Sequence, residues 1–197
     1  MTERPMTRAE AMSLAEEKRL VEQGYEFLDE KRVILAGEIM TRLADWRRLE
    51  TRQEAALAAA REALGAEIRR IGFEAVQFRP TSLQAQDPKV IPVRFLGARL
   101  LALSPNGRDT SNTPGDANVE DGAVATAFAH LHAVLADMAL VLANLYRLAD
   151  EYQRTERRAK ALENVLIPEI VADLKRIEAQ LEANEMEDAI RVRIAAG

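Results

Sequence analysis

The stretch FAHLHAVLADMALVLANLYRLADEY, residues 128–152, decides the fold of this chain of 197 residues. Its apolar residues recur at alternating steps of three and four over three consecutive heptads, which is the period of a coiled-coil seam. The seam consists of Phe128, Leu131, Leu135, Met138, Leu142, Leu145, Ala149 and Tyr152. The stretch therefore predicts a long helix whose apolar stripe packs against a second helix.

The same helical pattern extends over about residues 120–194. The repeat continues more loosely through Leu162, Leu166, Ile170, Leu174, Ile177 and Leu181. Pro168 interrupts it, and a proline inside a helix costs about 3 kcal/mol or more. Because the periodicity persists beyond it, we expect a helix kink at Pro168. The alternative is two helices, with Pro168 at the first position of the second.

A second long helix is predicted over residues 7–71, which contain no proline. Leu43, Leu57, Leu64 and Ile71 share one heptad position, and Ile39, Trp46 and Ala60 form a neighbouring seam. At about 1.5 Å per residue such a helix is roughly 100 Å long and needs a partner along its length. We therefore predict a mainly α fold, a long antiparallel two-helix coiled coil formed by residues 1–71 and 120–197.

Residues 72–119 form a middle segment of a different kind, predicted to be a small head. Its prolines are Pro80, Pro88, Pro92, Pro105 and Pro114. Two short β-capable runs predict a β-hairpin at about residues 90–103, joined by Gly97-Ala98 and with Pro92 confined to an edge position. Residues 104–118 have the composition of a loop.

Composition excludes several classes of protein. The chain is 48% hydrophobic but only 5% aromatic, and 30% of its residues are charged, which is typical of long solvated helices. It contains no cysteine, which excludes disulfide scaffolds and thiolate chemistry and fits the cytosol. A net charge of -5 offers no field that would attract nucleic acid. The first ten residues are too polar for a signal peptide.

The least charged stretch, residues 123–146, has the length of a membrane span. It contains Asp137, His130, His132 and Asn144, however, and its uninterrupted apolar runs are short. A bilayer span needs about 20 predominantly apolar residues. We expect a buried helix of a protein in water, with no direct membrane insertion.

No residues for catalysis, cofactors or metals are predicted. The chain has neither a phosphate-binding loop motif nor a dinucleotide-binding glycine motif. His130 and His132 lie two apart on a helix and point in different directions. Residues 116–127 resemble a calcium loop only faintly, since the glycine falls one place late and Ala127 stands where a glutamate is needed.

Two basic clusters and one glycine have both a structural and a functional interpretation. The candidate contact residues are Lys31 and Arg32 in the first cluster and Arg157 and Arg158 in the second. The first cluster also contains Arg42, Arg47 and Arg48, and the second also contains Arg154 and Lys160. They are either exposed positions paired with neighbouring acids or a contact surface for a partner. Gly24 costs about 1 kcal/mol against alanine inside a helix, so it is either tolerated or lets another backbone come close.

Two segments carry a resemblance to a known family. KRLVEQGYEFLDEKR, residues 18–32, is similar to the N-terminal signature of the D subunit of the V/A-type rotary ATPases. TERRAKALENVLIP, residues 155–168, resembles that family's Thr-x-Arg-Arg-Val-Asn-Ala-Leu-Glu-x-Val-x-Ile-Pro. The resemblance covers both long helices in order and spacing. It departs at Ala159-Lys160, at residues 184–187 and in the short C-terminal end, which is typical of a divergent branch.

The resemblance implies a mechanical role. The D subunit is the axle of the central stalk, a non-catalytic part that transmits torque between the catalytic hexamer and the ion-translocating ring. The implied partners are the A and B subunits of the hexamer, the F subunit, and the socket subunit (C/d) above the membrane ring. The implied location is cytoplasmic and peripheral to the membrane. On this reading Lys31, Arg32, Arg157 and Arg158 face acidic loops of the hexamer, and the hairpin contacts the F subunit or the hexamer rim.

Other functions stay open on the residues alone. One is a coiled-coil stalk of another hexameric ATPase, such as that of an export apparatus, although such stalks are simpler hairpins. Another is a free-standing coiled-coil scaffold or membrane-surface protein, which predicts self-association without an ATPase. The least favoured interpretation is a nucleotide-binding enzyme, which would require that the isolated chain binds or turns over nucleotide.

Overall fold

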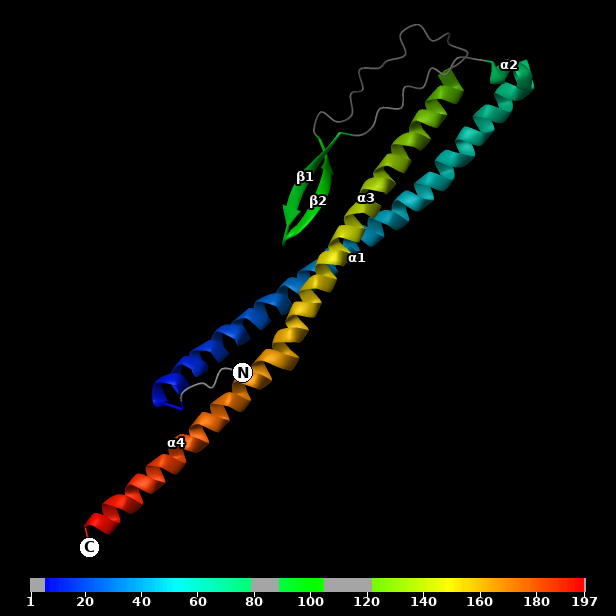
Figure 1. The fold of residues 1–197 in the computed structure, drawn as a ribbon. Helices are drawn as coiled ribbons and strands as arrows, with labels where there is room; N and C mark the ends of the chain where they lie inside the picture. The colour runs from blue at the N-terminus through cyan, green and yellow to red at the C-terminus, as the bar shows by residue number, and fades with distance from the viewer. Residues whose placement is uncertain (1–5, 79–88, 105–121, 197) are drawn as a thin grey trace. The chain divides into compact units, whose positions relative to one another are not determined.

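The computed structural model of the chain describes residues 6–78, 89–104 and 122–196. The described elements are, in order, α1 (Arg8–Ile71), α2 (Phe73–Gln77), β1 (Val90–Phe95), β2 (Ala98–Leu103), α3 (Gly122–Ala161), the π-helical turn η1 (Leu162–Leu166) and α4 (Ile167–Ala195) (Figure 1). A long N-terminal helix and a long C-terminal helix pack against each other, with a small two-stranded sheet between them in the sequence. This confirms the predicted mainly α fold.

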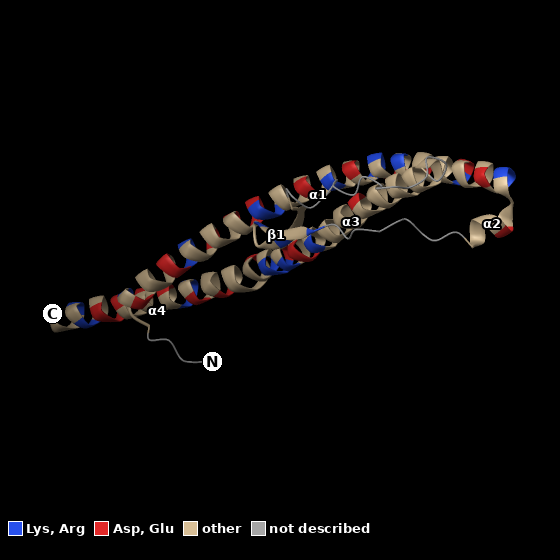
Figure 2. Cartoon of the chain, turned by 90° about the horizontal axis from the view of Figure 1, so that it is seen from above, with Lys and Arg blue, Asp and Glu red and all other residues tan. Residues whose placement is uncertain are grey.

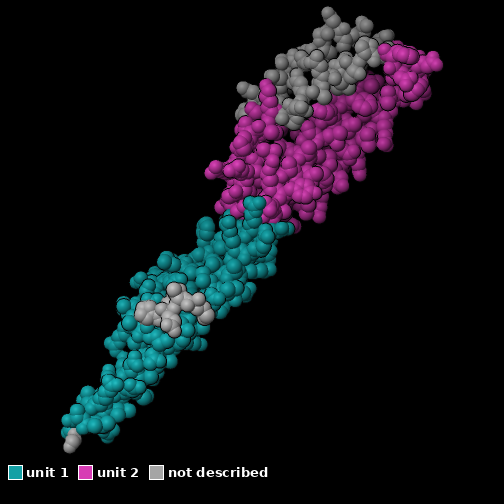
Figure 3. All heavy atoms as spheres, viewed as in Figure 1, with its two compact units in different colours: residues 1–34, 152–197 teal, residues 35–151 magenta. Residues whose placement is uncertain are grey.

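The chain divides into two compact units (Figure 3). Unit 1 consists of Met1–Ile34 and Tyr152–Gly197, and unit 2 of Leu35–Glu151. The boundary therefore falls inside α1 and inside α3, and each unit takes one segment from each long helix.

In unit 1 the start of α1 packs against α4 in the antiparallel sense. Leu14 is fully buried beside Ile170 and Ile177, and this small cluster is its core. Arg8, at the start of α1, forms an ion pair with Glu185, near the end of α4. Because residues early in α1 meet residues late in α4, the direction of pairing is the one that the sequence predicts.

One core cluster of unit 2 combines alanines with larger side chains. Ala56 and Ala60 of α1 pack against Leu131 and Val134 of α3, and all four are buried. Small side chains let the two helices approach closely, while the larger residues of α3 supply the apolar area. The predicted seam of residues 128–152 takes part in this contact only in part. Phe128 and Met138 pack against the cluster, whereas Leu135 and Leu142 are exposed.

The hairpin β1–β2 has the register Val90↔Leu103 through Phe95↔Ala98. Its two-residue turn is Leu96-Gly97 rather than the Gly97-Ala98 expected from the sequence, and both turn residues have positive φ, 46° and 92°. Two positive φ values are the mark of a type I′ turn, which matches the twist of the flanking strands. The predicted hairpin is confirmed, whereas residues 105–118 of the predicted loop lie outside the described residues.

A π-helical turn precedes Pro168 in the C-terminal helix. The helical backbone runs on from Ala161 through Leu162–Leu166 into α4, where Pro168 lies in the first turn. A proline ring clashes with the carbonyl four residues before it in an α-helix, and a wider turn relieves that clash. The chain thus continues as helix through Pro168, whereas the expected kink remains a prediction.

One described helical stretch is long and apolar enough to cross a membrane. This stretch is Gly122–Ala195. Only 11% of its most apolar 18-residue window is buried within the chain. The expectation of a buried helix is therefore wrong for the chain by itself, because a two-helix pairing covers only one stripe of each helix. The rest of this apolar surface is open to a partner.

Candidate partner-contact site

The four basic residues predicted to contact a partner lie in unit 1. Lys31 and Arg32 are half-buried on α1, and Arg157 and Arg158 are exposed on α3. Figure 2 shows that Lys and Arg alternate with Asp and Glu along the long helices. The basic positions are therefore embedded in a surface of mixed charge.

Several of these cations have local partners. Arg32 forms an ion pair with Asp29 one helical turn earlier. In the second cluster, Lys160 forms an ion pair with Glu156 at 2.8 Å, and the Arg157 Nε donates a hydrogen bond to the backbone carbonyl of Gln153 at 3.4 Å. Such i,i+3 and i,i+4 pairs on an exposed helix face stabilise the helix only weakly, so they leave the cations available for stronger contacts.

The charge of Glu156 connects the two basic clusters. The hydrogen bond and the positive charge of Lys160 lower the pKa of the Glu156 carboxyl, and the positive charge of Arg32 lowers it further, while desolvation opposes them. Arg32 is on α1 and Glu156 on α3, so the structure places the two clusters near each other within unit 1. The sequence does not show this proximity.

Gly24 faces the π-helical turn. A Cβ added at Gly24 would lie 3.8 Å from the Cδ1 of Leu162, which is an ordinary van der Waals distance. The neighbour at this place is a side chain, and among the described residues no backbone atom outside α1 lies as close to the added Cβ. Close approach of another backbone within the chain is therefore not the reason for glycine here, and contact with a partner remains a hypothesis.

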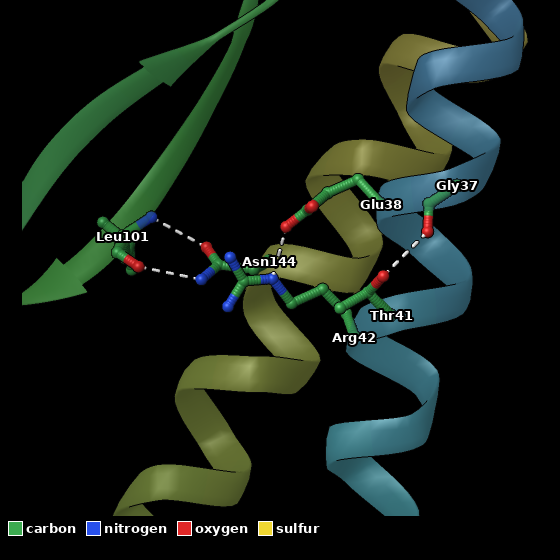
Figure 4. A network of polar contacts seen from close by, with 6 residues as sticks. All are labelled: Gly37, Glu38, Thr41, Arg42, Leu101 and Asn144. Atoms are coloured by element: carbon green, nitrogen blue, oxygen red, sulfur yellow. Dashed lines mark hydrogen bonds and ion pairs between the residues drawn. The ribbon is translucent and has the colours of Figure 1, made fainter.

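Unit 2 holds a polar contact that the sequence alone did not predict. The backbone N–H of Leu101 in β2 donates to the Oδ1 of Asn144 at 2.7 Å, and the Asn144 Nδ2 donates to the Leu101 carbonyl at 2.8 Å (Figure 4). Asn144 is only 3% exposed. Its one signal in the sequence is its position, as an asparagine within the least charged stretch of the chain.

Histidine and carboxylate side chains do not gather into a metal site among the described residues. Residues 6–78, 89–104 and 122–196 contain no group of three or more His, Asp or Glu side chains that could hold a metal ion. His130 and His132 are both exposed on α3. Each unit presents helices of mixed charge, and unit 2 also carries the hairpin; such surfaces suit contacts with other proteins.

Comparison with known proteins gives a consistent result. The family model for the D subunit of ATP synthase matches residues 10–197. The chain is 29% identical to a V-type ATP synthase D subunit of Anaeromyxobacter sp. (strain Fw109-5), over 98% of the chain and 93% of that protein. It is 25% identical to the V-type ATP synthase D subunit of Thermotoga neapolitana, over 95% and 94%. It is 28% identical to the A-type ATP synthase D subunit of Methanosarcina mazei, over 95% and 92%.

Proposed function

The chain belongs to the family of ATP synthase D subunits, and we propose that it is the non-catalytic rotor axle in the central stalk of a V/A-type rotary ATPase. The observation that carries the proposal is the family match over residues 10–197, which includes both long helices. The pairing of those helices supports it, because an axle needs two strands that cannot turn independently. The chain would transmit torque and leave the chemistry to other subunits.

The proposed mechanism is mechanical. Torque passes along two helices only if their seam resists slipping, and buried side chains such as Leu14, Ala60 and Ile177 supply that resistance. Rotation of an asymmetric axle then holds the catalytic sites of the hexamer in different states. Each step is a change in which packed interfaces are favoured, and such a change couples distant sites.

The proposed partners follow from the family. The A and B subunits would surround the ends of the two helices, while the F subunit and the socket subunit (C/d) would bind towards the hairpin-bearing part. Lys31, Arg32, Arg157 and Arg158 would face acidic loops of the hexamer, and the hairpin would contact the F subunit or the hexamer rim. The chain would be cytoplasmic and held at the membrane through these partners, with its exposed apolar surface covered by them rather than by lipid.

Affinity purification of the tagged chain from native membranes tests the proposal, with subunits identified by mass and an untagged strain as control. We expect the A, B and F subunits in stoichiometric amounts. Recovery of the chain alone would overturn the rotor assignment in favour of a free-standing scaffold. Recovery with an export ATPase would assign the same helices to another machine.

A further inference from the structure

The outer edge of strand β2 presents one peptide group to α3. The backbone bond from the Ser104 N–H to the Lys89 carbonyl, 2.8 Å long, sets the alternation of the ladder. In an antiparallel ladder every second pair is hydrogen-bonded, so the pair Pro92↔Leu101 is one of the pairs without ladder bonds. The N–H and the carbonyl of Leu101 therefore point away from β1.

Asn144 satisfies both of these groups. Its carboxamide accepts from the Leu101 N–H at 2.7 Å and donates to the Leu101 carbonyl at 2.8 Å. A carboxamide carries one acceptor and a donor side by side, as the peptide groups of a third strand would. Because Asn144 is only 3% exposed, water does not compete effectively for either bond.

The opposite edge of the hairpin is closed by Pro92. Pro92 is at the same ladder position as Leu101, so its backbone nitrogen faces outward from β1, and it has no hydrogen to donate. A proline at such a place blocks the addition of a further strand. The hairpin therefore has one edge bound to α3, and its other edge lacks a donor at the centre, which disfavours strand addition there.

We propose that Asn144 is a positioning residue that fixes the hairpin on α3 at a single register. The apolar side chains of Ala98 and Leu100 are buried on one face of β2. The backbone groups of Leu100 and Ala102 face β1, so a shift of the hairpin by one residue along α3 would leave Asn144 without a backbone partner. The two bonds to Leu101 select one position among those that apolar packing alone would allow. The hairpin then keeps one position relative to α3 and moves with it as a rigid unit.

This inference rests on the proposed function for its consequence, because a hairpin fixed to the axle presents its exposed residues to a partner at one defined angle. Ile91 and Val93 of β1 are 43% and 44% exposed and belong to the same apolar face as Leu100. Fixing the register at Asn144 determines where along α3 these two side chains are presented. Without the two bonds, Ile91 and Val93 would still be exposed on the hairpin, but the position of the hairpin along α3 would no longer be fixed.

Hydrogen exchange on the full chain tests whether the Asn144 side chain protects the Leu101 amide. The variant Asn144→Leu keeps the size of the side chain and removes both bonds. We expect the Leu101 amide to exchange about tenfold faster, as loss of a buried hydrogen bond predicts, with α3 still protected. The matched control is Asn184→Leu, which removes an amide on α4 that accepts from Gln180. Unchanged exchange at Leu101 in Asn144→Leu would overturn the proposal.

The variant Asn144→Asp separates hydrogen bonding from packing. A protonated carboxyl has one donor and one acceptor and can restore both bonds, whereas a carboxylate would face the Leu101 carbonyl. Burial and that carbonyl raise the pKa of the introduced carboxyl above its ordinary value of about 3.9. Below that pKa the Leu101 carbonyl keeps its donor, and this bond is lost as the pH rises through the pKa, whereas the Leu101 N–H has an acceptor in both forms. The carbon-13 shift of the Leu101 carbonyl measures the change, and a shift independent of pH would contradict the role of that bond.

Reconstitution with the partner subunits tests the positioning role. We expect Asn144→Leu to assemble and to lower ATP turnover coupled to rotation, while Asn184→Leu does not. Faster exchange at Leu101 with unchanged coupling would overturn the positioning role, although it would still show that Asn144 protects the Leu101 amide. Failure of the wild-type chain to assemble with the A, B and F subunits would instead reject the proposed function, and that result is distinct from either outcome.

Discussion

At the scale of single residues, Gly24 shows what a side chain costs or contributes where two helices meet. It lies in the interior of α1, where glycine is less favourable than alanine by about 0.8–1.0 kcal/mol. The space for a methyl group exists, with the Cδ1 of Leu162 at 3.8 Å from the added atom. Neither sterics nor backbone conformation within the described chain demands glycine, so the residue is a sensitive probe of the proposed partner contact.

We predict that Gly24→Ala stabilises the isolated chain by about 0.5–1 kcal/mol, through higher helix propensity and a new contact with Leu162. Urea unfolding followed by circular dichroism measures the change. Gly37→Ala is the matched control, because an added Cβ there meets nothing within 4 Å and gains propensity alone. A destabilised Gly24→Ala chain would contradict the described packing. A stabilised chain that no longer recovers the A and B subunits would assign Gly24 to the partner interface.

The four basic residues of unit 1 lead to a second prediction at this scale. Changing Lys31, Arg32, Arg157 and Arg158 together to glutamine should weaken hexamer binding by about 1–4 kcal/mol, since exposed ion pairs contribute about 0.2–1 kcal/mol each. Rotation-coupled ATP turnover in the reconstituted complex would fall, and raising the salt concentration should have a similar effect on the wild type. The measurement is turnover at several ionic strengths.

A control for this variant changes Arg47, Arg48, Arg61 and Arg69 to glutamine, four exposed cations of unit 2. It alters the net charge by the same amount and leaves the four tested residues of unit 1 unchanged. Equal coupling in the two quadruple variants would show that the unit 1 residues are ordinary solvated cations. That result would remove the electrostatic bearing from the proposal.

At the scale of elements, the π-helical turn explains why the apolar repeat becomes looser after residue 152. The residues buried or partly buried on this side of the C-terminal helix are Thr155, Ala159, Leu162, Leu166, Ile170, Leu174, Ile177 and Leu181. From Leu162 to Leu174 three steps of four follow one another, one residue more than the alternation of three and four allows. A π turn contains that extra residue, so the helical segments before and after the turn both keep their apolar stripe towards α1.

We predict that Pro168→Ala alone leaves the π turn in place, because the extra residue remains. Deleting Val165 alone should cost about 3 kcal/mol or more, since it places Pro168 inside a regular α-helix. The two changes together should give an unbroken α-helix of near wild-type stability. Urea unfolding gives the free energies, and backbone chemical shifts of residues 160–170 report the helix type. A combined variant less stable than either single variant would show that the π turn is needed for another reason.

At the scale of the whole molecule, the exposed apolar surface of the C-terminal helical stretch is the feature that needs a covering partner. Only 11% of its most apolar window is buried within the chain. The window itself is apolar enough to cross a bilayer by length and composition, so water-soluble partners and lipid compete as explanations. Asp137 in the same region favours partners, because a charged side chain at the bilayer centre costs about 2.5–3.5 kcal/mol or more.

We therefore predict that the isolated chain stays in the aqueous fraction when it is floated with vesicles of neutral and anionic lipid. Protease digestion should cut residues 122–146 equally with and without vesicles. A variant with Asp137→Leu and Asn144→Leu is the comparison, since it removes polar groups that oppose insertion. Flotation of the wild-type chain, or protection of this segment by lipid, would contradict the peripheral location.

The sequence by itself determined the elements and the family. Heptad spacing predicts both long helices, and the turn residues between two β-capable runs predict the hairpin, because each of these signals is local and periodic. The resemblance carried by residues 18–32 and 155–168 agrees with the family match over residues 10–197. The sequence also indicates that the helix is irregular near Pro168, but it does not predict the π-helical turn that precedes this proline.

Only the tertiary structure decided which distant residues meet. Asn144 and Leu101 are 43 residues apart, and their pairing depends on the height at which the hairpin lies along α3. The proximity of Arg32 and Glu156 depends in the same way on how far α1 is shifted along α3. A repeat of seven residues specifies which face of a helix is buried, but a shift by one whole heptad satisfies it equally well. Particular polar and packing contacts remove that ambiguity, and they exist only once the chain has folded back on itself.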